Sequence, residues 1–200
     1  DIGGVLIDWR PDRVYAELVP DPVERQQFFA EVCSPEWIAG WDAGRPLDEA
    51  CQELVQRYPQ YEQAIHAWRR QDEMVAEIAG TAAIVDQLKQ RGMALFLLTN
   101  MPTDVFEAQV SRFDVLKSFQ GAVVSGAEGV VKPDATIFRI LVDRYHLDVA
   151  RTLFIDDSPL NITAAQALGF QVHRFGTAPQ LAAELAQRGL LPAETVPPAR

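Results

Sequence analysis

The sequence predicts an α/β protein, in which a Rossmann-like, doubly wound parallel sheet carries an inserted, all-helical cap. Two observations predict this fold class. After residue 76, short apolar runs alternate with amphipathic helical patterns, which is typical of βαβ units whose parallel sheet has helices on both faces. Before that point, residues 11–75 have the apolar spacing of helices throughout.

These patterns divide the chain into two parts. A chain of 200 residues is long enough for one good core and a smaller insert. We expect residues 1–10 and 76–191 to form the core, residues 11–75 to form the cap, and residues 192–200 to form a flexible tail.

The first elements are a short apolar segment and the helices of the cap. Residues 2–7, IGGVLI, could finish a strand and begin a turn, because the two glycines permit positive φ angles. Asp21 and Ser34 each precede a proline, and such pairs are typical of an N-cap followed by the first helical residue. We therefore expect two cap helices to begin at these pairs.

The second part alternates regularly between strands and helices. Apolar runs predict strands at 93–99, 121–125, 151–156 and 170–175. Amphipathic patterns predict helices at 81–92, 102–113, 133–146, 159–169 and 178–189.

The composition excludes several classes of protein. A formal net charge of −10 argues against nucleic acid as the main partner, because phosphate backbones require clustered Lys and Arg. No apolar run approaches the ~18 residues of a transmembrane helix, so we expect no membrane partner. Cys33 and Cys51 lack metal-like spacing, and we interpret them as buried free thiols in a reducing cytoplasm. The oligomeric state stays open.

Polar residues stand beside the ends of several predicted strands. They are Asp1–Gly3, Thr99–Asn100, Lys132 and Asp156–Asp157. Because ligands of open parallel sheets bind beyond the carboxyl ends of the strands, we expect these four places to lie close together in space.

This set of side chains fits phosphoryl transfer through an enzyme carboxylate. A carboxylate that attacks phosphorus forms an acyl phosphate and divides one difficult step into two. Because two anions approach one another, a divalent cation on hard oxygen ligands and a lysine must neutralise charge. Hydroxyl and backbone N–H donors, together with the start of the helix near Pro102, would hold the phosphate oxygens.

Four segments resemble the motifs of the haloacid dehalogenase-like (HAD) hydrolase superfamily. They are DIGGV at 1–5, LLTN at 97–100, VVKPD at 130–134 and LFIDDSPLNI at 153–162. The first is similar to the DxGxV opening of sugar-phosphatase-like members that carry a helical cap. The resemblance covers the whole chain, and it also implies a strand leading into Asp1 that this sequence does not include.

The resemblance implies catalytic and substrate-binding roles. Asp1 would be the nucleophile, and Lys132 would neutralise Asp1 and the phosphoryl oxygens. Thr99 would bind the phosphate through its hydroxyl and Asn100 through its backbone N–H. Gly3 is a further substrate-binding residue that the resemblance implies.

The resemblance also implies a Mg²⁺ site. Its ligands would be the carboxylates of Asp1 and Asp157 and the backbone carbonyl of Gly3. Asp156 stands where many members have Gly, so it receives a supporting role, and Asn161 would support a metal-bound water.

The first motif departs from the pattern of many phosphatases in this superfamily. Those proteins have a second Asp, the general acid and base, where this chain has Gly3. Three accounts stay open: another group or a water supplies the proton, the reaction is slow, or the nucleophile attacks carbon instead of phosphorus.

Trp37 and Trp41 stand four residues apart in the predicted cap. Core packing is the default for such a pair. The functional alternative is that the two rings line the cap surface above the pocket and select the substrate, for example by stacking on a sugar.

These inferences predict a Mg²⁺-dependent phosphatase of the HAD superfamily that acts on a small phosphorylated metabolite such as a sugar phosphate. The first alternative is a metal-independent 2-haloacid dehalogenase, in which the same Asp attacks carbon. The second is a degenerate family member that only binds ligands.

Overall fold

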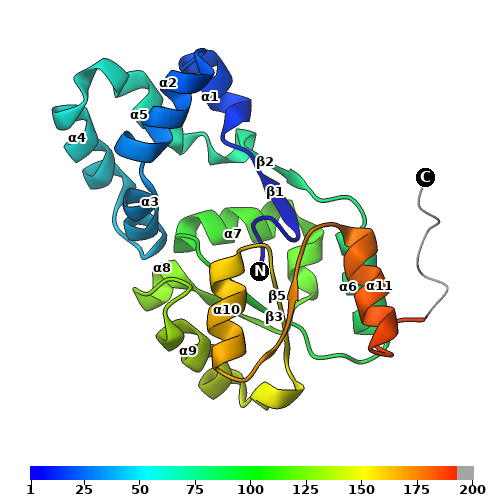
Figure 1. The fold of residues 1–200 in the computed structure, drawn as a ribbon. Coiled ribbons are helices and arrows are strands. Elements are labelled where there is room, and N and C mark those ends of the chain that lie inside the picture. The colour runs from blue at the N-terminus through cyan, green and yellow to red at the C-terminus, as the bar shows by residue number, and fades with distance from the viewer. Residues whose placement is uncertain (193–200) are drawn as a thin grey trace.

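The computed structural model describes residues 1–192. The tail that we predict over 192–200 therefore lies outside the described residues, apart from Pro192. Figure 1 shows helices α1–α5 gathered in one lobe, beside a second lobe that holds the other helices and most of the strands. Within the described part of the chain, no helix is both long and apolar enough to cross a lipid bilayer.

The first lobe is helical. Asp21 caps its second helix by accepting a hydrogen bond from the Val23 N–H, and Ser34 caps the third by accepting one from the Trp37 N–H. Both predicted Asp-Pro and Ser-Pro helix starts are therefore confirmed. The helices are α1 (Asp12–Leu18), α2 (Pro22–Gln27), α3 (Pro35–Asp42), α4 (Leu47–Arg57) and α5 (Glu62–His66).

Two chain segments connect the lobes, and they pair with each other. β1 (Ile7–Trp9) runs antiparallel to β2 (Val75–Glu77), with Asp8 opposite Ala76. β2 was not predicted, and the predicted helical block extends to residue 75, because this three-residue strand is too short to show a period. The strand predicted within 2–7 is also wrong, since the structure has a turn there that closes at Ile7.

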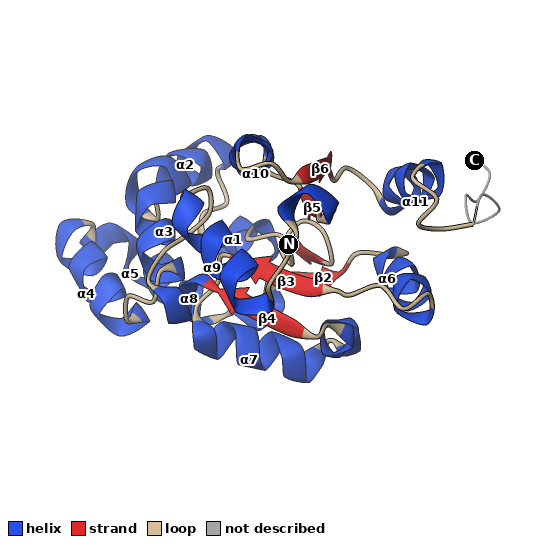
Figure 2. Ribbon diagram, turned by 90° about the horizontal axis from the view of Figure 1, so that it is seen from below, coloured by secondary structure: helices blue, strands red, loops and turns tan. Residues whose placement is uncertain are grey.

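The second lobe contains two pairs of parallel strands. β3 (Phe96–Thr99) pairs with β4 (Gly121–Val124), and β5 (Leu153–Asp156) pairs with β6 (Gln171–Arg174). All four strands lie within predicted strand segments, and Figure 2 shows helices on both sides of them, with α7 and α10 on opposite sides. The α/β fold class is therefore confirmed, while the domain boundaries stay a prediction.

Five of the six α-helices that the structure describes in the second lobe match predicted segments. The sixth, the four-residue helix α8 (Ser125–Glu128), was not predicted. Asp134 caps α9 through the Thr136 N–H, so this helix begins after Pro133 and not at it. The five matching helices are α6 (Thr81–Gln90), α7 (Thr103–Arg112), α9 (Ala135–Tyr145), α10 (Pro159–Ala167) and α11 (Ala178–Gln187).

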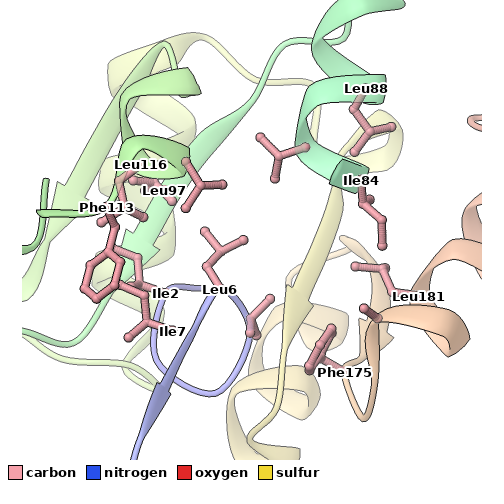
Figure 3. Close-up of a cluster of buried hydrophobic side chains, with 14 of the residues drawn as sticks. Ile2, Leu6, Ile7, Ile84, Leu88, Leu97, Phe113, Leu116, Phe175 and Leu181 are labelled. Atoms are coloured by element: carbon pink, nitrogen blue, oxygen red, sulfur yellow. The ribbon is translucent and has the colours of Figure 1, made fainter. Parts of the chain in front are cut away.

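The second lobe buries its apolar side chains in clusters on the two sides of the strands. Figure 3 shows one cluster, in which Ile2 and Leu6 from the turn after Asp1 pack near Leu97 of β3. The second cluster contains Phe138 of α9 and Phe154 of β5. The turn after Asp1 is thus anchored by its own apolar side chains.

The helical lobe has a separate core around Trp68. This fully buried ring lies 5.3 Å from the Trp37 ring and 5.8 Å from the Trp41 ring, both edge to face. Cys33 and Cys51 are buried in the same cluster as free thiols, as predicted. Because this lobe buries its own apolar surface, it can form a unit beside the strand-containing lobe.

Candidate active site

Asp1 lies at the end of β5. Its main-chain nitrogen donates a hydrogen bond to the carbonyl of Ile155 at 2.9 Å, and its carboxylate accepts one from the Ile2 N–H at 2.7 Å. The turn that follows is closed by hydrogen bonds from the N–H groups of Leu6 and Ile7 to the Ile2 carbonyl. These bonds fix the direction of the Asp1 carboxylate.

Lys132 joins three segments of the chain at this point. Its side chain is 1% exposed, and its Nζ lies 2.9 Å from Asp1 Oδ1 and 2.7 Å from Asp156 Oδ2. The same ammonium donates a hydrogen bond to the carbonyl of Leu98 in β3 at 3.0 Å. Two of the three N–H donors of the ammonium thus bond to Leu98 and Asp156, and its charge is also balanced by the ion pair with Asp1.

Asp156 is fully buried, and both of its oxygens are engaged. Oδ2 accepts from Lys132, while Oδ1 accepts from the Ser158 N–H at 2.9 Å and from Asn161 Nδ2 at 3.0 Å. Burial alone would raise the pKa of Asp156, but the Lys132 ammonium and the donated hydrogen bonds outweigh it and hold the pKa below its usual range. Asp156 and Asn161 thus act together to orient Lys132.

Asn100 holds the main chain of Lys132. Its Nδ2 donates to the Lys132 carbonyl at 2.9 Å, and its Oδ1 accepts from the Lys132 N–H at 2.7 Å. We predict a role for the Asn100 backbone, whereas this positioning role of its side chain was missed. Thr99, the last residue of β3, is buried beside it and lines the same cavity as Asp1.

Asp157 is exposed and approaches Asp1. The carboxylates of Asp1, Asp156 and Asp157 each offer an oxygen, and these atoms lie within 4.8 Å of one another. Both oxygens of Asp156 are already bonded. Asp1 Oδ1 is engaged by Ile2 and Lys132, which leaves Asp1 Oδ2 and the Asp157 carboxylate to hold a cation. Hard carboxylate oxygens are the donors that Mg²⁺ prefers, so the residues present fit the predicted metal.

A cavity of about 300 Å³ opens above these groups. Its floor is polar and includes Asp1, Thr99, Lys132 and Asp157, and Gly3 also lines it. Its walls are mostly apolar and come from β1 and β2, the helical lobe and α7. The wall residues include Ile7, Trp9, Ile38, Trp41, Val75 and Val105.

The two predicted cap tryptophans differ in position. Both pack on Trp68, but only Trp41 lines the cavity, while Trp37 Nε1 donates to the Ala50 carbonyl at 3.2 Å. Asp42, the residue after Trp41, also lines the cavity and was missed. Its adjacency to Trp41 at the end of a helix was the only available signal.

The residues of the site match one family of enzymes. Residues 39–175 match the family model of haloacid dehalogenase-like hydrolases. This match spans more than half of the chain and includes Thr99, Lys132 and Asp157. The chain belongs to the haloacid dehalogenase-like hydrolase family.

The known proteins similar to this hydrolase include one named as a phosphatase and one solved in complex with inorganic phosphate. Sesquiterpene phosphatase astK from Aspergillus oryzae is 26% identical over 170 residues, which are 84% of each chain. HAD family enzyme bt-2542 from Bacteroides thetaiotaomicron, solved in complex with magnesium and inorganic phosphate, has a TM-score of 0.65 and 20% identity, covering 88% of this chain and 92% of that chain. A predicted HAD-like family hydrolase from Porphyromonas gingivalis has a TM-score of 0.71 and 20% identity, covering 94% of each chain.

We expect Gly4 to be required for the position of Asp157. Gly4 has a φ of +73°, and a Cβ at this position would overlap Asp157 Oδ2. Gly4→Ala should therefore displace this carboxylate and lower the affinity for Mn²⁺, measured by titration calorimetry, by at least about tenfold. Gly92→Ala is the matched control, because Gly92 has the same φ of +73° but a Cβ there would meet no atom within 4 Å. Equal Mn²⁺ affinities for the two variants would contradict this role.

We expect Asp156→Asn to destabilise the protein by about 3–5 kcal/mol at pH 7, because it removes a buried partner of Lys132. The lowered pKa means that the carboxylate contributes stability above about pH 4 and loses this contribution as the pH falls through the lowered value. The difference from wild type, measured by urea unfolding, should thus shrink in acid. Exposed Asp86→Asn is the control, and a pH-independent difference for Asp156→Asn would be inconsistent with this account.

Proposed function

We propose that this hydrolase is a Mg²⁺-dependent phosphomonoesterase that reacts through an aspartyl phosphate on Asp1. The observation that carries this proposal is the position of the Asp1 carboxylate. It lies 2.9 Å from the Lys132 ammonium and beside the Asp157 carboxylate, at the floor of a cavity large enough for a small ester. The name of the relative astK, a phosphatase, supports the same reaction class.

Each residue at the floor has a distinct role in this proposal. An Asp1 oxygen attacks phosphorus, and the ammonium of Lys132 holds Asp1 in line and neutralises the phosphoryl oxygens. The hydroxyl of Thr99 and the backbone N–H of Asn100 hold the remaining oxygens. Asp1, Thr99, Asn100 and Lys132 all line the cavity, which supports these proposed roles.

Asp1, Asp157 and the carbonyl of Gly3 would hold the Mg²⁺. Bound there, the cation would neutralise charge on the phosphate and on the two carboxylates. Without it, Asp1 and Asp157 would repel each other and the substrate, which is why we propose that activity depends on the metal.

The cavity walls favour an apolar alcohol as the leaving group. Ile38 and Trp41 from the helical lobe and Val105 from α7 offer apolar surface above the polar floor. A sugar would leave its hydroxyl groups against this surface, which is unfavourable. We therefore propose a phosphate ester of an apolar alcohol in preference to the sugar phosphate suggested by the first motif. The name of astK, a sesquiterpene phosphatase, agrees with this class.

We expect phosphate release from p-nitrophenyl phosphate to require Mg²⁺ and to stop in EDTA. Asp1→Asn should lower kcat by about 10⁴-fold or more, because it removes the nucleophile, while exposed Asp86→Asn should retain wild-type activity. Colorimetric phosphate assays measure both effects. Chloride release from 2-chloropropionate that EDTA does not inhibit would instead support the dehalogenase. Binding of Mg²⁺ and beryllofluoride without any turnover would support a binding module.

We expect kcat/KM for linear alkyl phosphates to rise with chain length from ethyl to octyl. Each methylene that enters the apolar part of the cavity should contribute about 0.8 kcal/mol, which is roughly fourfold in kcat/KM. Glucose 6-phosphate, assayed under the same conditions, should be a poorer substrate than octyl phosphate. If kcat/KM did not change with chain length and the sugar phosphate were turned over faster, the proposed apolar substrate would be wrong. The proposed phosphatase activity would be unaffected.

A further inference from the structure

The proposed reaction needs a proton donor that the first motif does not provide. Gly3 stands two residues after Asp1 and has no side chain. When an alcohol leaves a phosphate ester, its oxygen must be protonated, and a positioned acid contributes about 10²–10⁴-fold to the rate. A donor must therefore reach the cavity from elsewhere in the fold.

Among the described residues, three carboxyl groups line the cavity: Asp1, Asp42 and Asp157. Asp1 is the proposed nucleophile and is paired with Lys132. Asp157 lies with Asp1 where the cation would bind. Asp42 enters from the helical lobe, and within residues 1–192 its carboxyl group has no hydrogen bond or ion pair. It is therefore free to interact with a substrate.

Contacts between the lobes fix the main chain of Asp42. The fully buried Ser125 donates from Oγ to the Asp42 carbonyl at 2.6 Å and accepts at the same Oγ from the Met101 N–H at 2.8 Å. Gly44 packs so closely that a Cβ there would lie 2.7 Å from the carbonyl oxygen of Gly126. The end of α3 is thus seated on the start of α8, and Ser125 links it to Met101 in the loop that follows Thr99 and Asn100.

The surroundings of Asp42 suit a group that both gives and takes a proton. Burial raises the pKa of Asp42 to about 7, and the positive charge of Lys132 opposes this shift without cancelling it. The acidic side chains on the other elements that pack on α3 are exposed or paired with arginine. Glu31, Asp48, Glu49 and Glu53 are exposed, and Glu128 is paired with Arg144. At neutral pH both protonation states of Asp42 are therefore populated.

We propose that Asp42 is the general acid and base of this hydrolase and that it replaces the carboxyl group missing at Gly3. In the first step an Asp1 oxygen bonds to phosphorus, the bond from phosphorus to the alcohol oxygen breaks, and that oxygen takes the proton of Asp42. In the second step the Asp42 carboxylate takes a proton from water, the water oxygen bonds to phosphorus, and Asp1 is released. This inference rests on the proposed phosphatase function.

The test compares two leaving groups in wild type and Asp42→Asn. p-Nitrophenolate leaves without protonation, whereas octanol requires it, and kcat/KM reports the first step. We expect Asp42→Asn to lower kcat/KM for octyl phosphate by about 10²–10⁴-fold and to change kcat/KM for p-nitrophenyl phosphate by less than about tenfold. Because the second step loses its base, the variant should also release a burst of one equivalent of p-nitrophenolate before slow turnover.

The pH profile is a second measurement of the same role. In wild type, kcat/KM for octyl phosphate should fall as the pH rises through about 7, because Asp42 loses its proton there. This decrease of kcat/KM with rising pH should disappear in Asp42→Asn and return in Asp42→Glu. The matched control is Glu49→Gln, which neutralises an exposed carboxylate of the same lobe and should match wild type.

The outcomes separate this inference from the phosphatase itself. If Asp42→Asn lowered kcat/KM equally for both esters, or for neither, the proposed role of Asp42 would be wrong. Turnover by the wild type would still support the phosphatase function. Absence of phosphate release from either ester by folded wild-type protein with Mg²⁺ would overturn both.

Discussion

The ion cluster around Lys132 is the constraint on which the site depends. A buried ammonium is stable only when its donors are satisfied and its charge is balanced. Here the balancing groups are Asp1 and Asp156, and the end of β3 supplies the third acceptor through Leu98. Since these partners come from distant parts of the sequence, the chain must assemble them correctly to bury the charge. The geometry required for chemistry and the geometry required for folding are therefore the same.

The two lobes contribute different chemistry to one cavity. The strand ends bring charge and hydrogen-bond donors to its floor, and their positions are set by main-chain pairing and by Asn100. The helical lobe, built around Trp68, brings apolar surface and one carboxyl group, that of Asp42. The polar floor is suited to a phosphate group, and the apolar walls are suited to the organic group that would carry this phosphate.

The sequence predicted what short-range patterns encode. Strand ends and N-caps could be located, because each depends on neighbouring residues. β2 and α8 were missed because, unlike the four-residue strands β3–β6, neither lies within a longer apolar run, and their existence depends on partners elsewhere. Asp42 could not be assigned for a related reason. Its place in the cavity depends on how α3 meets Ser125, a contact across 83 positions of sequence.

That contact also bears on how such an enzyme could diversify. The seat of α3 consists of a serine hydroxyl, backbone carbonyls and the close approach of Gly44 to Gly126. None of these atoms belongs to the side chains of Ile38 or Trp41, which face the ligand space from the same helix. Mutation of Ile38 can therefore reshape the wall without removing these contacts, whereas Trp41 also packs on Trp68 in the core of the lobe. A scaffold of this kind allows new molecules to be accepted through few substitutions, while the reacting groups are inherited unchanged.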